Sequence, residues 1–196
     1  MDKMQMLENR LQSQDGVISA ADAAEMQISK VYFMEFVRRH HLERVAHGIY
    51  HAPDAWQDSF RLLQMRFPKI IFSHESAAYL FNLAEREPLR MTVTVPSGYH
   101  SAALSESAKV YQIRQEVFEL GLTQAVSPTG FPVRVYNAER TVCDLLRSRS
   151  QVEIQDLLAA LKTYVRQTDR NIPLLTRYAK KLRVENKLRS YLEVLL

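Results

Sequence analysis

Cysteine and glycine are both scarce in this sequence of 196 residues, which contains one cysteine, Cys143, and five glycines. A single cysteine excludes an intramolecular disulfide and fits a reducing compartment. The glycines form neither a G-x-G-x-x-G nor a G-K-S/T motif, so the sequence offers no recognisable phosphate-cradling loop. We therefore expect neither a disulfide framework nor ATP-dependent catalysis.

Long hydrophobic runs are absent as well. No apolar stretch approaches the roughly 20 residues that a transmembrane helix needs. The first residues, MDKMQMLENRL, are too polar for a secretory signal. Because 46% of the residues are hydrophobic, the chain can still build a core. These features predict a cytoplasmic protein with no membrane partner.

Charge is distributed unevenly along the chain, whose formal net charge is +4. Residues 1–56 carry six Lys and Arg against eight acids, a net charge of −2, whereas residues 140–196 carry twelve against six, a net charge of +6. Since phosphate neutralisation dominates DNA affinity, the basic C-terminal segment supplies five candidate phosphate contacts. They are Lys180, Lys181, Arg183, Lys187 and Arg189.

The segment from Gly16 to Pro53 has the element order of a winged helix-turn-helix. A short helix is predicted from Ser19 to Glu25, followed by the three-residue break Met26-Gln27-Ile28. A longer helix is predicted from Ser29 to about His40. Each helix begins at a serine, whose hydroxyl can accept a hydrogen bond from a backbone N–H of the first turn.

Three short strands are predicted around these helices. Two apolar-polar runs, at residues 42–45 and 49–51, are joined through His47-Gly48, where glycine permits the positive φ of a tight turn. Residues 16–18 can supply the third strand of the same small sheet. The alternative interpretation is an ordinary amphipathic helix and hairpin in a protein-contacting domain.

The longer helix is predicted to have a buried and an exposed face. Val31, Met34 and Val37 recur at three-residue steps and are expected to form the buried stripe. The N-terminal residues of a recognition helix meet base edges, so candidate base contacts are Ser29, Lys30, Tyr32 and Phe33. Candidate phosphate contacts in and after this helix are Arg38, Arg39, Arg44 and His47.

The remainder, residues 56–196, is predicted to be a mixed α/β domain with a small sheet and a helical C-terminus. Strands are predicted at residues 91–96, 109–114, 122–126 and 131–136, with a short strand or lead-in at 70–72. Helices are predicted at residues 56–67, 73–83, 138–147, 151–165 and, as a final pair, 173–196. Asn137 is expected to cap the helix at 138–147. With a first helix at residues 2–12, the fold class is α+β, with a winged helix-turn-helix in residues 1–55.

Four histidines lie close together in the N-terminal part of the sequence, but they do not form a recognisable metal motif. They are His40, His41, His47 and His51. A zinc site would need a fixed ligand set, and the one cysteine is far away. We therefore interpret these residues as exposed or turn residues and expect no metal.

Three further groups in the second part have a chemical and a structural interpretation. His74 and Glu75 have the makings of an acid–base pair, but a helix N-terminus capped by Ser73 explains them better. Arg140 and Asp144, four residues apart, are interpreted as a buried structural pair. Cys143 is interpreted as an inert core thiol. We therefore expect no catalytic residues, no cofactor and no enzymatic activity.

Several motifs, in their order along the chain, resemble the AbiEi antitoxins of type IV toxin–antitoxin systems. In the N-terminal part they are GVIS at residues 16–19, Ala23-Ala24, and LERVAHGIY at residues 42–50. In the second part they are SHESA at residues 73–77, VTVP at residues 93–96, and NAERTVCDLL at residues 137–146. The last is similar to the family's Ala-x-Arg-Thr-x-x-Asp helix, and the resemblance covers nearly the whole chain. Family members often have arginine around the turn glycine, where this chain has His47 and His51.

The resemblance implies a function in two parts. Such proteins repress their own operon by binding repeats in its double-stranded promoter DNA, and they neutralise a toxin of the nucleotidyltransferase class, typically without a stable complex. It implies that the N-terminal part binds DNA and that the second part carries the antitoxin activity.

Two other functions remain open from the sequence. One is a sequence-specific regulator of another operon, whose second part binds a protein or small-molecule effector. The other is a DNA-processing hydrolase attached to a winged helix. A hydrolase of this kind would need clustered acids with a lysine on the predicted strands, and we find no such arrangement.

Overall fold

The computed structural model describes residues 2–195 and divides the chain into two compact units, Met1–Pro68 and Lys69–Leu196. We treat each unit by itself. The division falls later than the boundary predicted near Pro53, because helix α4, Ser59–Arg66, belongs to the first unit. The side chain of Arg61 on α4 donates a hydrogen bond to the backbone carbonyl of Gln14 at 2.7 Å.

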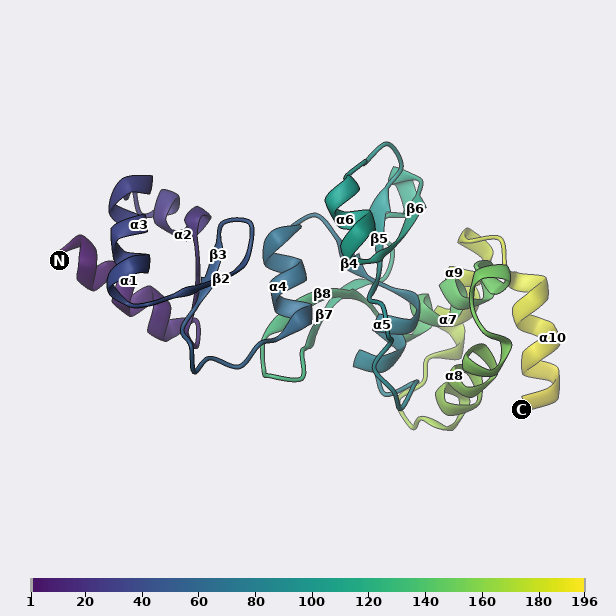
Figure 1. The fold of residues 1–196 in the computed structure, drawn as a ribbon. Coiled ribbons are helices and arrows are strands. Elements are labelled where there is room, and N and C mark those ends of the chain that lie inside the picture. The colour runs from purple at the N-terminus through teal and green to yellow at the C-terminus, as the bar shows by residue number, and fades with distance from the viewer. Residues whose placement is uncertain (1, 196) are drawn as a thin grey trace. The chain divides into compact units, whose positions relative to one another are not determined.

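Residues 2–68, the described part of the first unit, form four helices and three strands, which can be followed in Figure 1. In chain order they are α1 Lys3–Ser13, β1 Val17–Ser19, α2 Ala20–Glu25, α3 Lys30–Arg39, β2 Glu43–Ala46, β3 Ile49–His51 and α4. The strands form an antiparallel sheet in the order β1-β3-β2. The helices and strands predicted for residues 2–51 are thus confirmed, within one or two residues at their ends.

Both predicted serine caps are present in the first unit. Ser19 and Asp22 form a capping box, in which the Ser19 hydroxyl accepts from the backbone N–H of Asp22 and the Asp22 carboxylate accepts from that of Ser19. The hydroxyl of Ser29 accepts from the N–H of Tyr32 at 3.4 Å. Because a cap requires only residues three positions apart, these helix starts are encoded locally.

The core of the first unit is built from all three N-terminal helices and the adjoining strand and turns. Its buried members are Leu7, Ile18, Ala23, Ile28, Phe33, Phe36, Val37 and Leu42. The ring of Phe33 meets that of Tyr50 on β3 edge to face, with centroids 5.6 Å apart. This packing fixes the face that α3 turns inward.

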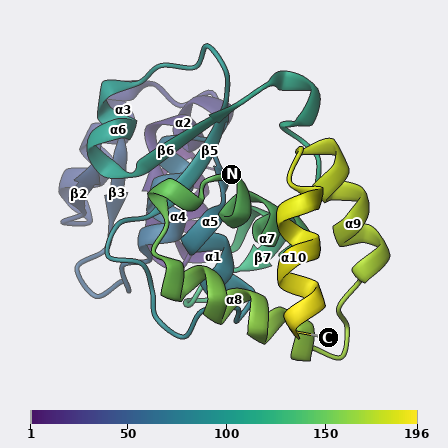
Figure 2. The ribbon, with the colours of Figure 1, turned by 90° about the vertical axis from the view of Figure 1, so that its right-hand side faces the viewer.

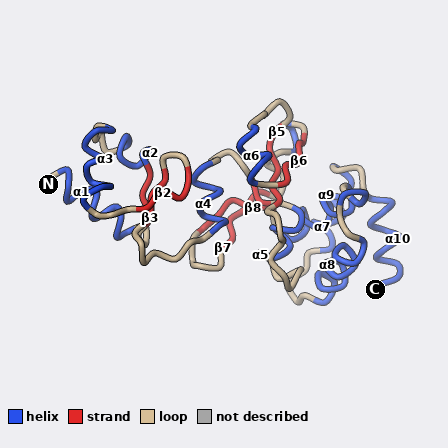
Figure 3. Tube along the Cα trace, in the orientation of Figure 1, coloured by secondary structure: helices blue, strands red, loops and turns tan. Residues whose placement is uncertain are grey.

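The second unit contains a five-stranded mixed sheet and most of the helices (Figure 3). Its strands are β4 Ile71–Phe72, β5 Thr92–Pro96, β6 Lys109–Ile113, β7 Leu122–Val126 and β8 Pro132–Tyr136. The strand order is β6-β5-β4-β8-β7, with parallel pairs β5–β6 and β4–β8 and antiparallel pairs β4–β5 and β7–β8. The predicted strands are confirmed, and the short run at residues 71–72 is the central one.

The helices of the second unit follow or interrupt these strands. They are α5 His74–Leu80, α6 Ala102–Ser107, α7 Ala138–Arg147, α8 Ile154–Arg166, α9 Ile172–Lys181 and α10 Glu185–Leu195, with 3-10 turns at Gln115–Val117 and Arg149–Gln151. Helix α6 and the 3-10 turns were not predicted. The predicted end of the last helix at Leu196 lies outside the described residues. These elements confirm an α+β fold with small sheets.

Helix α7 is the centre of the second unit. Eight of its residues, from Glu139 to Leu146, are buried, and α5, α8, α9 and α10 all pack against it. Helices α9 and α10 lie side by side (Figure 2). Asn137 caps α7 as predicted, since its side-chain oxygen accepts from the N–H of Arg140 at 3.0 Å.

Candidate nucleic-acid interface

The start of α3 is exposed and carries the first candidate contacts. Ser29 and Lys30 are exposed, and Tyr32 is half-buried against the core. Val31 is 78% exposed. A ten-residue helix with a capped and solvent-facing N-terminus offers backbone N–H groups and side chains that a groove of DNA can accommodate.

The structure corrects the predicted orientation of α3. Phe33 was predicted as a base contact, but its side chain is 1% exposed and lies in the core with Phe36 and Val37. Val31 was predicted to be buried and faces solvent instead. The two phenylalanine rings remove more apolar surface from water than valine and methionine would, so packing turns the helix toward them. Phe33 is therefore excluded as a DNA contact.

Cationic side chains are exposed at both ends of α3 and on β2. Lys30, Arg38 and Arg39 project from the helix, and Arg44 projects from β2. Within residues 2–195 none of these four cations forms an ion pair, although Arg38 donates to the carbonyl of Met34 at 3.4 Å. Unpaired cations can neutralise phosphates without first breaking a salt bridge.

The β2–β3 turn places two predicted contacts together. The guanidinium of Arg44 lies 3.1 Å from Nδ1 of His47, and its Nε donates to the carbonyl of Ala46 at 3.3 Å. Gly48 has φ +71°, which a tight turn of this kind requires. The carbonyl of Gly48 accepts a hydrogen bond from the N–H of Ala20 at 2.7 Å, so the turn is attached to the start of α2.

Two acids of the first unit, Asp22 and Glu25, are paired with Arg10, whereas Glu35 is exposed on α3. Arg10 lies 3.2 Å from Glu25 and 3.6 Å from Asp22. His40 lies 3.5 Å from Glu8. The contacts with Arg10 offset part of the negative charge of a unit that is not basic overall.

The predicted phosphate contacts of the C-terminal segment are all exposed. Lys180 and Lys181 end α9, Arg183 lies in the turn, and Lys187 and Arg189 lie on α10. Glu185 forms ion pairs with two of them, with Lys180 at 3.6 Å and with Arg189 at 3.9 Å. Helices α9 and α10 therefore carry a basic surface on the second unit, which is partly neutralised by its own acid.

The predicted pair Arg140–Asp144 is buried in α7. Nε of Arg140 lies 2.9 Å from Oδ2 of Asp144, and both side chains are almost fully buried. Nη1 of Arg140 also donates to the carbonyls of Val117 and Leu120, at 2.8 and 2.7 Å. The pair thus fastens α7 to the segment between β6 and β7, which supports the structural interpretation.

His74 is a buried connector rather than half of an acid–base pair with Glu75. Its Nδ1 lies 2.9 Å from Oγ of Ser73, its Nε2 lies 3.0 Å from Oγ of Ser148, and its ring stacks on Tyr111 at 3.5 Å. Burial, helped by the positive charges of Arg147, Lys109 and Arg140, holds the pKa of His74 well below its usual value. The imidazole is neutral and links the start of α5 to the end of α7.

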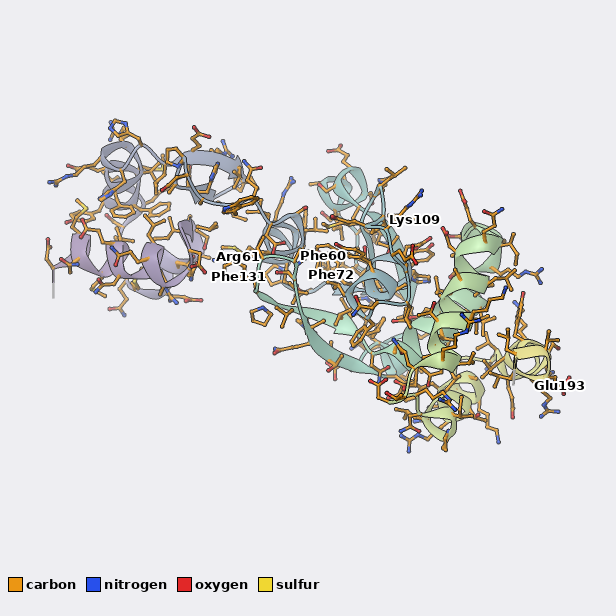
Figure 4. All side chains as sticks on the ribbon, turned by 90° about the horizontal axis from the view of Figure 1, so that it is seen from below. Phe60, Arg61, Phe72, Lys109, Phe131 and Glu193 are labelled. Carbon is orange, nitrogen blue, oxygen red and sulfur yellow. The ribbon has the colours of Figure 1, made fainter. Side chains whose placement is uncertain are left out.

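Ser73 does not cap α5, contrary to the prediction. Its hydroxyl bonds to His74 and accepts from the hydroxyl of Thr94 at 2.8 Å. Glu75 pairs instead with Lys109, whose Nζ lies 3.7 Å away and donates to the carbonyl of Gln151. The side chain of Lys109 lies at the surface of the second unit (Figure 4).

A cavity of about 820 Å³ opens beside this ion pair. It lies between α5, α8, the start of β6 and the loop of residues 83–90, and charges of both signs line it, among them Glu75, Arg90, Lys109 and Asp156. Its size falls in the range of small-molecule sites.

The N-terminal histidines are dispersed in the structure. His41 and His47 are exposed, whereas His51 is buried beside Glu43, at 3.5 Å. Within the described residues, no group of three or more His, Cys, Asp or Glu side chains is placed to hold a metal ion. No helix in residues 2–195 is both long enough and apolar enough to cross a membrane.

The comparisons with known proteins support the fold alone. No family model matches the sequence, and no curated protein does. Among solved structures, the chain is similar to the RV2827C protein from Mycobacterium tuberculosis, with 16% sequence identity and a TM-score of 0.57. The match covers 89% of this chain and 70% of the other, so the likeness in fold extends over most of this chain.

Proposed function

We propose that this chain is a DNA-binding antitoxin and transcriptional autorepressor of a type IV toxin–antitoxin operon. Its first unit acts as a winged helix-turn-helix, in which α3 enters the major groove and the β2–β3 turn contacts the backbone. Its second unit neutralises a nucleotidyltransferase toxin.

The observation that carries the DNA-binding half is the set of cations on α3 and β2 that form no ion pair within the described residues. Lys30 stands at the first position of the helix, where side chains reach base edges. Arg38 and Arg39 at its other end and Arg44 on β2 are spread over the same small unit, as phosphate contacts on both sides of a groove require. The order of α2, a three-residue turn, α3 and a two-stranded hairpin supports the same proposal.

The antitoxin half rests on the resemblance to the AbiEi family. The motif that carries it in the second unit, residues 137–146, lies almost entirely in the core around the Arg140–Asp144 pair. It therefore maintains the fold and does not itself meet a partner. Contact with a toxin or with its substrate is assigned to the surface of the second unit.

Gel shifts with the promoter of the chain's own operon test the DNA-binding half. Lys30→Ala and Tyr32→Ala should each abolish specific retardation while the circular dichroism spectrum is kept. Lys162→Ala, an exposed lysine on α8, removes the same charge and should leave binding unchanged. If both α3 variants bind the promoter with unaltered affinity, α3 does not contact the DNA.

A second candidate function is a regulator of another operon, whose second unit binds a small-molecule effector. The cavity beside Glu75 and Lys109 favours it, since its volume of about 820 Å³ suits a metabolite with charges of both signs. Co-expression with the product of a neighbouring nucleotidyltransferase gene separates the two functions. Growth rescue supports the antitoxin, whereas absence of rescue together with metabolite-dependent release of DNA supports the regulator.

A further inference from the structure

Val31 is an apolar side chain placed among cations on the outer surface of α3. It is 78% exposed at the second position of the helix, next to Lys30. Trp56 of the first unit is also strongly exposed, at 85%, but it lies between β3 and α4, outside the helix-turn-helix elements. Single exposed apolar residues are common on proteins, so the position of Val31 matters more than its exposure.

Val31 belongs to a row that faces away from the core. Val31, Glu35 and Arg38 are separated by four and three residues and lie on one side of the helix, and all three are exposed. Glu35 stands in the middle of the row. A carboxylate is repelled by phosphates but accepts a hydrogen bond from the amino group of cytosine. If a DNA duplex binds to this face of α3, we therefore expect base edges, and not phosphates, to lie opposite Glu35.

Base edges in the major groove offer one apolar group, the C5 methyl of thymine. Valine is β-branched and is held in essentially one rotamer in a helix. Val31 therefore presents its two methyl groups in a fixed direction at the end of α3 that enters the groove.

We propose that Val31 is a specificity-determining residue that packs against the C5 methyl group of a thymine in the operator. This inference rests on the proposed DNA-binding function, and it adds a base preference that charge alone cannot provide. The lysine and arginines around it hold the duplex, whereas Val31 distinguishes thymine from the other bases.

Replacing single thymines by deoxyuridine tests this contact in the full-length protein. Deoxyuridine pairs with adenine as thymine does but lacks the C5 methyl group. On the promoter fragment of its own operon, wild-type protein should lose about three- to tenfold in affinity at one or two thymines of each repeat. Val31→Ser should bind the normal duplex with a similar loss and should show no further loss at those deoxyuridines.

Two further variants make the result specific. Val31→Ile keeps a branched side chain and should retain the difference between thymine and deoxyuridine. Val194→Ser changes a valine of α10 that is 84% exposed, and it should behave as wild type. The contact would be overturned if the losses of affinity caused by Val31→Ser and by each deoxyuridine simply added. It would also be overturned if the wild-type protein bound every substituted duplex as tightly as the normal one. Both of those results would leave DNA binding intact, whereas no retardation of any promoter duplex would overturn the proposed function itself.

Discussion

Arg140 and Asp144 form an ion pair inside α7, with Nε and Oδ2 2.9 Å apart and less than a twentieth of either side chain exposed. The guanidinium also lies over the ring of Tyr136, with its carbon 4.1 Å from the ring centroid. Burial raises the pKa of the Asp144 carboxyl, and Arg140 opposes that rise. Each charge in the pair therefore depends on the other.

Removing one member of this pair should strongly destabilise the second unit. Arg140→Leu leaves a buried carboxylate without its cation and should cost about 3–5 kcal/mol of unfolding free energy, measured by urea denaturation. Arg140→Leu with Asp144→Leu removes both charges and should recover much of that loss. Arg189→Leu breaks a surface pair and should cost less than about 1 kcal/mol. A small effect of Arg140→Leu alone would refute a stabilising pair.

Stability should fall with acid because of His74. Burial, with nearby cations, keeps the pKa of His74 well below 6.5 in the folded protein, whereas the unfolded chain binds a proton below about pH 6.5. The contribution of the neutral imidazole is therefore complete above that pH and is lost as the pH falls below it, by at most about 1.4 kcal/mol per pH unit.

Urea midpoints of variants between about pH 7.5 and pH 5.5 measure this effect. His74→Asn should lower the midpoint at all pH values and should flatten its dependence on pH. Asparagine is chosen because the backbone at this position has φ +50°, which asparagine tolerates. His100→Asn, at an exposed histidine, should keep the wild-type slope. An unchanged slope in His74→Asn would assign the acid sensitivity to another group.

Salt dependence should separate the two basic surfaces. If Arg38 and Arg44 each neutralise a phosphate, replacing either by alanine should reduce the slope of log affinity against log salt by about 0.9. Neutralising the five exposed basic residues of residues 180–189 should flatten the slope further if α9 and α10 contact the DNA. If the slope stays at the wild-type value, the basic surface of α9 and α10 does not contact the DNA.

The two functions should separate at the boundary between the units. Residues 69–196 alone should protect cells from the cognate toxin without repressing the promoter, and residues 1–68 should bind DNA without protecting. Growth during toxin co-expression and a promoter reporter measure both. Protection by the first unit alone would reverse the assignment.

The first unit should need α4 to be stable. A fragment that ends at residue 55 lacks α4 and therefore lacks the hydrogen bond from the Arg61 side chain to the carbonyl of Gln14. It should therefore melt at a lower temperature than a fragment of residues 1–68, as followed by circular dichroism. Equal melting temperatures would show that α4 does not stabilise this unit.

The sequence was sufficient to predict features that depend on residues close together in the chain. The caps at Ser19, Ser29 and Asn137 each need one side chain and a backbone N–H three residues later. The short β2–β3 connection needs the glycine at residue 48. The Arg140–Asp144 pair needs only a spacing of four residues on a helix.

The orientation of α3 could not be obtained in the same way. Six of its residues between 31 and 37 are apolar or aromatic, so the pattern is compatible with more than one buried face. The buried face is determined by packing of Phe33 against the ring of Tyr50 on β3 and by the other members of the core. For the same reason, the exposed Val31 became visible as a candidate contact only in the folded unit.

The hydrogen bond from the N–H of Ala20 to the carbonyl of Gly48 joins the β2–β3 turn to the start of α2. This contact restrains the turn relative to α2, so that under the proposed function DNA would meet a turn and a helix that are already in position. Little conformational entropy would then be lost on association, and a change in affinity would be expressed mainly in the lifetime of the complex. Under the proposed function, the β2–β3 turn would therefore meet the DNA backbone in a position set by its contact with α2.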